Sequence, residues 1–344
     1  MIYQSIIDTA CDTPILKVNC FKDYFESDLN VKLEYFNPSS SIKDRPAINM
    51  IREAERASLL KPSGTIIEST SGNVGKALAM AGAALGYKVI IVVDPKTSKL
   101  TLDYIRSLGA EIVMVEEVDE DGSYQKTRFQ KVQELLKKIP NSFNPDQYNN
   151  PDNPRAHELY TSNEIVKDFK RLDSFVACVS TGGHFSGISK ALKREYPDIT
   201  CLAVDSTGSS IISGMYKPYL MNGIGLSWKA GTLEFDNMDR YVQVTDDIAF
   251  ALCRYFAKET GILIGGSGGA ALYGLLMAAK YKNSSHVALG VIPDTGLNYL
   301  DQFYNDDWLR SKGIYQLPTI EQIVEHVYQT DDVFYPNKEK ATTK

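Results

Sequence analysis

Short apolar runs alternate along the chain with segments in which apolar residues recur with a helical period. The runs are rich in β-branched residues and are bounded by Gly, Pro, Asp or Ser, which is typical of buried strands. The other segments have the 3.6-residue period of helices that cover a sheet. The predicted strands are Thr65–Glu68, Val89–Val93, Ile112–Val115, Phe175–Val179, Cys201–Val204 and Val287–Ile292. The predicted helices are Asn73–Leu85, Ser98–Leu108, Tyr124–Lys138, Arg155–Lys167, Phe185–Glu195, Ile248–Glu259 and Ala270–Lys280.

The repeated order of strand and helix predicts an α/β fold with mostly parallel sheets flanked by helices. The chain has 344 residues, more than a single hydrophobic core usually holds, so we expect two lobes. The segment Phe143–Arg155 is dense in Asn and Pro and is the expected crossing between them. Sheets of this kind bind ligands in the turns that follow the carboxyl ends of their strands.

Two glycine-rich turns at such positions suit anions. In Glu68–Gly75, hydroxyls and backbone N–H groups stand at a helix start that favours a carboxylate or phosphate, although an ordinary helix cap accounts for the same residues. In Val179–Gly187, successive glycines let the backbone approach an anion, and we favour phosphate binding over a plain turn. Its spacing matches neither a Walker loop nor a dinucleotide-binding turn.

A third turn, Gly265–Gly269, follows a predicted apolar strand, Ile262–Ile264, and its central Ser267 is either a partner for a ring nitrogen or part of a tight turn. Lys43 follows three serines and precedes Asp44, where a helical pattern begins. An imine-forming lysine needs such an accessible polar setting, but the serines also suit an ordinary helix start. The lysine and the three turns together indicate pyridoxal phosphate, which has an aldehyde, a phosphate and a ring nitrogen.

Composition narrows the class of partner. A net charge of −6 and the absence of a basic run argue against nucleic acid. No apolar stretch approaches the about 20 residues that a membrane span needs, and the N-terminus has no export pattern. Five scattered cysteines without a C-x-x-C pair predict neither a zinc site nor a disulfide framework, and they favour the cytoplasm. The four histidines do not cluster, so we expect no metal.

The segments Asn37–Arg45, Thr70–Asn73, Ser180–Gly183 and Gly266–Gly268 resemble the cysteine synthase/cystathionine β-synthase family of fold-type II pyridoxal phosphate enzymes, whose fold is similar to the tryptophan synthase β subunit. The resemblance implies that Lys43 forms the Schiff base and removes the α-proton. It further implies a cofactor site made of Asn73 at the ring hydroxyl, Ser180, Thr181, Gly182, Gly183 and His184 at the phosphate, and Ser267 at the pyridine nitrogen. The substrate carboxylate would be held by Thr70, Ser71 and Gln147.

The same resemblance implies a homodimer and a two-domain chain. The expected smaller, mobile domain covers residues 44–150 and carries the substrate-carboxylate loop. The expected larger, cofactor-binding domain covers residues 1–43 and 151–330, and residues 331–344 form a C-terminal tail.

A narrower resemblance, carried by Glu68–Asn73, Val93–Lys96, Met114–Glu117, Thr127–Arg128 and Lys131–Leu136, is to the N-(2-amino-2-carboxyethyl)-L-glutamate synthases. These siderophore-pathway enzymes join O-phospho-L-serine and L-glutamate by β-replacement through an aminoacrylate, on the route to 2,3-diaminopropionate. In that subfamily an arginine, a tyrosine and a serine favour the phosphorylated substrate. The matching positions here are Arg128, Tyr148 and Ser180. A guanidinium suits a phosphate leaving group because it donates two parallel, charge-assisted hydrogen bonds.

Other features leave the second substrate open. Val74 replaces the threonine typical of cysteine synthases, which favours the narrower subfamily. However, the second glycine of the phosphate turn, Gly183, and the run Gln147–Pro154 are similar to cysteine synthases, so a cysteine synthase that uses O-phosphoserine or O-acetylserine with sulfide is the alternative. The intact Lys43 argues against a non-catalytic member, and the missing fingerprint spacing argues against a nicotinamide oxidoreductase.

Overall fold

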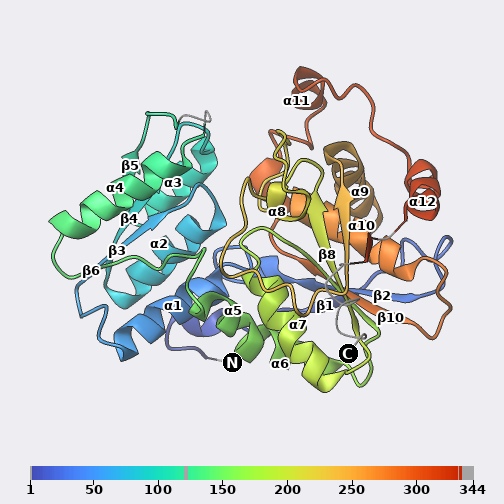
Figure 1. The fold of residues 1–344 in the computed structure, drawn as a ribbon, viewed down its shortest axis with the longest axis horizontal. Helices are drawn as coiled ribbons and strands as arrows, with labels where there is room; N and C mark the ends of the chain where they lie inside the picture. Colours follow the sequence, from blue (N-terminus) through green and yellow to red (C-terminus); the bar gives the residue numbers. More distant parts are fainter. Residues whose placement is uncertain (1, 120–122, 332, 335–344) are drawn as a thin grey trace, which may run out of the picture. The chain divides into compact units, whose positions relative to one another are not determined.

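The computed structural model describes residues 2–119, 123–331 and 333–334. The chain forms two compact units, each built around its own sheet (Figure 1). Unit 1 comprises Met1–Asp12 and Asn37–Ala156, and unit 2 comprises Thr13–Phe36 and His157–Lys344. The predicted α/β fold with parallel sheets flanked by helices is confirmed.

Unit 1 is a four-stranded parallel sheet with helices on both faces. Its strands, in the order β5-β4-β3-β6, are β3 Thr65–Ser69, β4 Lys88–Val93, β5 Glu111–Met114 and β6 Ser142–Phe143. Its helices are α1 Asp44–Arg56, α2 Asn73–Leu85, α3 Lys99–Ser107, α4 Gln125–Lys138 and α5 Asp152–Ala156, with a 3-10 helix at Ile6–Thr9. Neighbouring residues of a strand face opposite sides, so Ile66 packs with α1, α2 and α3, whereas Ile67 packs with α4.

Unit 2 is a seven-stranded sheet in the order β1-β2-β10-β7-β8-β9-β11, parallel except for its two edge strands. Its strands are β1 Ile15–Lys17, β2 Asp28–Leu33, β7 Ser174–Cys178, β8 Thr200–Ser206, β9 Arg240–Val244, β10 Val287–Ile292 and β11 Val333–Phe334. Its helices are α6 Ser162–Asp168, α7 Gly183–Glu195, α8 Ser210–Ser213, α9 Asp246–Thr260, α10 Gly266–Ala279, α11 Asp306–Ser311 and α12 Ile320–Gln329, with a π-helical turn at His157–Thr161 and 3-10 helices at Glu34–Phe36 and Gly296–Tyr299.

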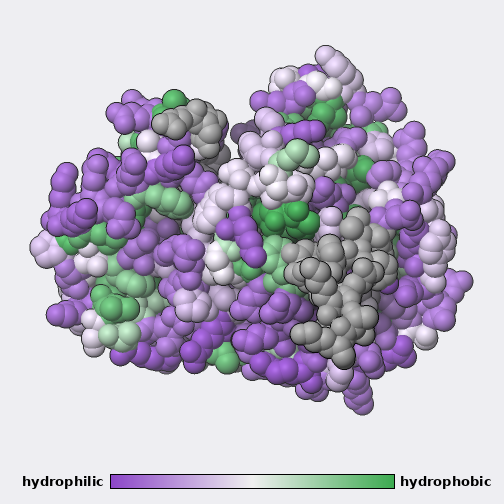
Figure 2. Space-filling model, viewed as in Figure 1, coloured by the Kyte–Doolittle hydropathy of each residue, from purple (hydrophilic) through white to green (hydrophobic). Residues whose placement is uncertain are grey.

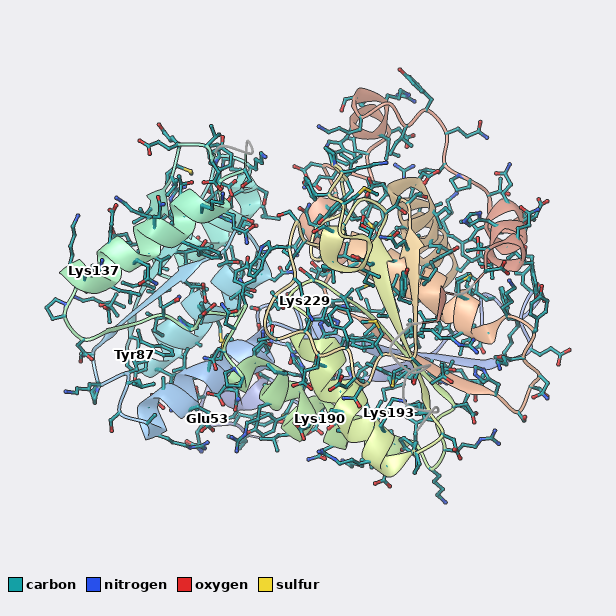
Figure 3. All side chains as sticks on the ribbon, in the orientation of Figure 1. Glu53, Tyr87, Lys137, Lys190, Lys193 and Lys229 are labelled. Carbon is teal, nitrogen blue, oxygen red and sulfur yellow. The ribbon has the colours of Figure 1, made fainter. Side chains whose placement is uncertain are left out.

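Helices cover both faces of the unit 2 sheet. Val176 packs in the core that contains α10, whereas its neighbour Phe175 contacts Phe185 of α7 with ring centroids 6.1 Å apart. The outer surface of α7 carries Lys190 and Lys193 (Figure 3), which form ion pairs with Glu158 and Asp239. Hydrophilic residues cover most of the face drawn in Figure 2. No helix within the described ranges is long and apolar enough to cross a bilayer.

The unit boundaries differ from the expected domain boundaries. Residues 1–43 are expected in the larger domain, but the 3-10 helix Ile6–Thr9 contacts α2 and buries Ile7, so the N-terminus belongs to unit 1. The loop before α1 also stays in unit 1, because the Ser39 N–H binds the Asp44 carboxylate of α1 at 2.7 Å. Within the expected tail, β11 pairs with β9, and residues 335–344 lie outside the described part of the chain.

Several elements differ from the sequence prediction for physical reasons. The strand β2 is absent from the prediction because its interior is polar: Lys32 is fully buried and forms an ion pair with Glu164 at 2.7 Å. The predicted helix Arg155–Lys167 is divided into α5, the π-helical turn and α6. The predicted strand Ile262–Ile264 is wrong, since this segment forms only an isolated bridge, from Ile264 to Thr295.

Candidate functional site

Lys43 lies at the N-terminus of α1, in a loop that hydrogen bonds hold in place. The buried Asp44 carboxylate accepts hydrogen bonds from both the N–H and the hydroxyl of Ser39, and the Lys43 N–H donates to Ser41 Oγ at 3.2 Å. Ser40 has a φ of 64°, a left-handed conformation that costs a serine about 1 kcal/mol. Such backbone strain is frequent at functional sites. The loop therefore presents a partly buried Lys43 in a rigid polar setting.

The Thr70–Asn73 turn joins β3 to α2. Gly72 is the N-cap residue of α2, and no side chain caps this helix start. Thr70 is buried, Ser71 is exposed, and a Cβ added to Gly72 would meet no atom within 4 Å. The turn therefore opens onto free space, and its backbone N–H groups suit a carboxylate.

Glu68 links this turn to Gln147. Its buried carboxyl accepts the Ser69 N–H at 2.8 Å and the Gln147 N–H at 3.3 Å. Burial raises the pKa of Glu68 to about 7, and the two N–H donors oppose the rise. Glu68 is absent from the predicted site residues, although a carboxyl inside an otherwise apolar strand was a signal in the sequence.

Arg128 and Tyr148 lie in the same part of unit 1. Arg128 Nη1 is 3.1 Å from Asp94 Oδ2, an ion pair rather than a hydrogen bond, and Arg128 Nε is buried without a hydrogen-bond partner in the described residues. Tyr148 packs edge-to-face on Phe129 with ring centroids 5.6 Å apart. Burial raises the pKa of Tyr148 to about 12, opposed by the positive charge of Arg128, so its phenol is neutral beside a guanidinium.

Asp119 caps α4, the helix that carries Arg128. Its carboxylate accepts the N–H groups of Lys126 at 2.8 Å and Thr127 at 2.9 Å, and the hydroxyl of Ser123 at 2.8 Å. Burial alone would raise the pKa of Asp119, but these hydrogen bonds lower it to about 2. The carboxylate is therefore ionised at neutral pH and stabilises the start of α4.

In unit 2, the Ser180–His184 turn joins β7 to α7. Gly182 is the N-cap residue of α7 with a φ of 86°, and no side chain caps this helix. A Cβ added to Gly182 would lie 2.5 Å from Leu233 Cβ, so only glycine fits. The glycines therefore form a close backbone cradle, which fits a phosphate.

The segment after α8 holds this turn. Ser180 Oγ donates to the Gly225 carbonyl at 3.1 Å, and the Thr232 hydroxyl donates to the Thr181 carbonyl at 2.7 Å. His184 is buried on the first turn of α7, so its position suits packing rather than proton transfer to solvent.

Ser267 lies in the first turn of α10 and is only 2% exposed. The Ser267 carbonyl accepts the Cys178 thiol at 2.9 Å. Its hydroxyl makes no hydrogen bond within the described chain, and Oγ is 3.7 Å from the position of a Cβ on Gly223. A nearly buried hydroxyl without a partner fits a ring nitrogen, and together with the glycine cradle it meets two requirements of pyridoxal phosphate.

The predicted residues divide between the two units. Unit 1 contains Lys43, Thr70, Ser71, Asn73, Arg128, Gln147 and Tyr148, and unit 2 contains Ser180, Thr181, Gly182, Gly183, His184 and Ser267. Of the three residues expected to favour a phosphorylated substrate, Arg128 and Tyr148 therefore share a unit, whereas Ser180 belongs to the other. All five cysteines are free thiols, and no metal-binding group of three or more His, Cys, Asp or Glu occurs among the described residues.

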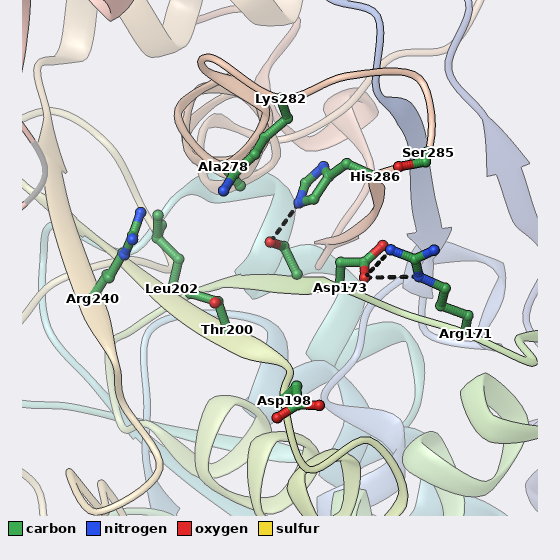
Figure 4. A pocket seen from close by; sticks show the side chains of 11 residues that line it. Arg171, Asp173, Asp198, Thr200, Leu202, Arg240, Ala278, Lys282, Ser285 and His286 are labelled. Carbon is green, nitrogen blue, oxygen red and sulfur yellow. Dashed lines mark hydrogen bonds and ion pairs between the residues drawn. The ribbon is translucent and has the colours of Figure 1, made fainter.

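A cavity of about 230 Å³ in unit 2 is lined by none of the predicted site residues of that unit (Figure 4). Its lining includes the first residues of β7 and β9, so it lies at the amino ends of the strands. Arg171 pairs with Asp173 there at 2.9 Å, and His286 Nε2 contacts Ser174 Oγ at 2.9 Å. The Ser180–His184 turn follows the carboxyl end of β7, at the opposite edge, where parallel sheets bind their ligands.

Comparison with known proteins gives consistent matches over most of the chain. Residues 6–293 match the family model of pyridoxal-phosphate dependent enzymes. A cysteine synthase from Staphylococcus aureus is 39% identical over 291 residues, which cover 84% of this chain and 92% of that protein. The crystal structure of a cysteine synthase from Entamoeba histolytica aligns with a TM-score of 0.84 and 31% identity over 96% of this chain and 97% of that one. The crystal structure of an O-ureido-L-serine synthase aligns with a TM-score of 0.82 and 32% identity over 90% and 100%.

Proposed function

The chain belongs to the pyridoxal-phosphate-dependent enzymes and is a β-replacement enzyme of the cysteine synthase type, and on this premise we propose that it joins O-phospho-L-serine and L-glutamate. The products would be N-(2-amino-2-carboxyethyl)-L-glutamate and phosphate. In the siderophore pathway of the enzymes that the chain resembles, this compound leads to 2,3-diaminopropionate.

The buried guanidinium of Arg128 carries this proposal. Arg128 is 9% exposed and its Nε has no hydrogen-bond partner in the described chain, a state that costs free energy unless an anion approaches. The neutral phenol of Tyr148 adds a second donor in the same environment. A phosphate oxygen accepts from both groups more strongly than the ester oxygen of an acetyl group does, since its hydrogen bonds are charge-assisted.

We assign the cofactor contacts residue by residue. Pyridoxal phosphate, when bound, supplies an aldehyde for amino groups and a ring that stabilises negative charge at the substrate's Cα. Lys43 would hold the aldehyde covalently, and once the substrate's amino group has displaced it there, its freed amine would take the Cα proton. The backbone at Ser180–His184 holds the phosphate, and Asn73 holds the ring hydroxyl. Ser267 would hold the ring nitrogen through its neutral hydroxyl, which carries no acidic proton to transfer to the ring.

The substrate contacts follow from unit 1. Thr70, Ser71 and Gln147 hold the α-carboxylate through hydroxyl, amide and backbone donors. Arg128 and Tyr148 bind the β-phosphate and stabilise its negative charge as the bond to Cβ breaks. Glutamate then supplies the amine that forms the new bond at Cβ.

A substrate matrix tests this function. Purified holoenzyme receives O-phospho-L-serine or O-acetyl-L-serine, together with L-glutamate or sulfide, and released phosphate and the condensed product are measured. We expect sustained phosphate release only with O-phosphoserine and glutamate. Sulfide-dependent cysteine formation at a comparable rate, without use of glutamate, contradicts the proposal.

The second candidate is a cysteine synthase that uses O-phosphoserine or O-acetylserine with sulfide. It is favoured by the 39% identity to a cysteine synthase and by the second glycine of the phosphate turn, Gly183. The same matrix separates the two candidates. We also expect a homodimer, which light scattering on the purified protein tests.

A further inference from the structure

One buried carboxyl joins two segments that are far apart in the sequence. Glu68 Oε1 accepts the Ser69 N–H at 2.8 Å, and Oε2 accepts the Gln147 N–H at 3.3 Å. Ser69 opens the turn that contains Thr70 and Ser71, and Gln147 lies in the segment between β6 and α5. The carboxyl therefore connects both segments to which we assign the substrate's α-carboxylate.

We propose that Glu68, in its ionised form, is a positioning residue that holds the Thr70–Gly72 turn and Gln147 in place for the substrate's α-carboxylate. The inference rests on the proposed assignment of Thr70, Ser71 and Gln147 to that carboxylate. An ionised carboxyl only accepts hydrogen bonds, so it binds both N–H groups, whereas a protonated one turns one oxygen into a donor. Protonation of Glu68 therefore weakens one of the two connections.

The surroundings of Glu68 set its proton affinity. Burial is the largest effect and raises the pKa of Glu68 to about 7, so the group changes charge near neutral pH. The negative charge of Asp146 adds to the rise, whereas the N–H donors and the Asn144 amide oppose it. Tyr148 is a further titratable group that interacts with Glu68, and burial keeps its phenol neutral in this range.

A cavity of about 220 Å³ lies against the carboxyl within unit 1. Glu68, Ser69, Asn144 and Asp146 contribute to its lining, and α4 contributes only uncharged side chains, among them Gln133. Ser69 Oγ is buried without a hydrogen-bond partner in the described chain. A cavity of this size holds several water molecules, which bond such groups and exchange protons with the carboxyl.

The test measures binding of L-alanine to the holoenzyme, followed by the absorbance of the cofactor between about pH 6 and about pH 8. L-Alanine has the α-carboxylate but no leaving group, so turnover does not enter. Glu134→Gln is the matched control, since Glu134 is exposed on α4. We expect the dissociation constant for L-alanine to rise on acidification in the wild type and in the Glu134→Gln control. This rise should be about tenfold larger than the rise in Glu68→Gln. Glu68→Gln is expected to bind weakly throughout.

A second variant keeps the test valid if Glu68→Gln folds poorly. Asp146→Asn removes the negative charge that raises the pKa of Glu68, so the change in binding should move to lower pH. Asp146 has a φ of 50°, a conformation that asparagine also adopts readily. The inference is overturned if Glu68→Gln follows the control at every pH, or if Asp146→Asn leaves the midpoint unchanged.

The outcome is independent of the leaving group and of the second substrate. If alanine binding behaves as expected but O-phosphoserine is not used, the proposed function fails and the role of Glu68 stands. If O-phosphoserine and glutamate are used but alanine binding does not depend on Glu68, only the inference fails.

Discussion

Asp94 and Arg128 form a buried ion pair, with 3.1 Å between Oδ2 and Nη1. The other oxygen of Asp94 accepts the Lys96 N–H at 2.8 Å, which fixes the orientation of the carboxylate after β4. Arg128 is thus neutralised on one side while its Nε side lacks a partner in the described residues. An ion pair of this kind orients a guanidinium for an incoming phosphate without leaving an isolated buried charge.

Replacement of Arg128 should affect one first substrate far more than the other. We expect Arg128→Ala to lower kcat/KM for O-phosphoserine about 100-fold and to change that for O-acetylserine by less than about threefold, because only the phosphate forms charge-assisted hydrogen bonds with it. Steady-state kinetics with both substrates measure the ratio. The double variant Arg128→Ala/Asp94→Asn is the control, since it removes the carboxylate that the single variant leaves buried without its partner. Equal losses for both substrates would mean a structural role.

Lys43→Ala should give a folded protein that does not turn over. We expect kcat to fall about 1000-fold or more, because no other residue assigned here supplies the amine that takes the Cα proton. Circular dichroism checks folding, and the visible absorbance of the imine-bound cofactor should be missing. Lys99→Ala, an exposed lysine on α3, is the control and should keep both activity and colour. Normal turnover of Lys43→Ala would refute the assignment.

Alanine substitutions at two glycines with positive φ distinguish the cost of backbone strain from the cost of a steric clash. Gly182→Ala should destabilise the fold by about 3 kcal/mol and weaken cofactor binding, because the left-handed conformation is combined with a Cβ 2.5 Å from Leu233. Gly86 has a similar φ, 77°, but a Cβ added there would meet no atom within 4 Å. We therefore expect Gly86→Ala to destabilise the fold by only about 1 kcal/mol. Chemical denaturation and cofactor titration of the two variants measure the difference. Similar effects on cofactor affinity would show that the cradle at Gly182 is not a cofactor site.

The cap of α4 predicts a pH-dependent contribution to stability. Asp119→Ala should lower the free energy of unfolding by about 1 to 2 kcal/mol at neutral pH. The pKa of Asp119 in the folded protein is lowered to about 2, so its contribution is present above the unfolded pKa of about 4 and is lost as the pH falls through about 2. Urea unfolding of the wild type and variant across this range measures the convergence. A difference that persists unchanged in acid would exclude the ionised cap.

The sequence predicts the strands whose residues are apolar and the turns that follow them. The helix α2 coincides with the prediction because its Ala-rich pattern continues to a glycine C-cap at Gly86. The strand β2 could not be predicted in this way, since its buried Lys32 depends on Glu164, a partner distant in sequence. For the same reason the Asp94–Arg128 pair and the connection through Glu68 become visible only in the folded chain.

The boundaries between the two units also could not be predicted from local sequence. The chain enters unit 1, crosses to unit 2 at Thr13 and returns at Asn37, and no local change in composition marks these crossings. They are determined by long-range contacts, such as the pairing of β2 with β10 over residues 28–33 and 287–292.

The edge strands of unit 2 bear on how the protein behaves at high concentration. The strands β1 and β11 are short and antiparallel to their neighbours, and each occupies one side of an otherwise parallel sheet. A bare parallel edge presents unpaired N–H and C=O groups to other molecules, which is a route to aggregation. Proteolytic trimming that removes β11 would expose β9 in this way, so we expect the solubility of a preparation to depend on an intact β11.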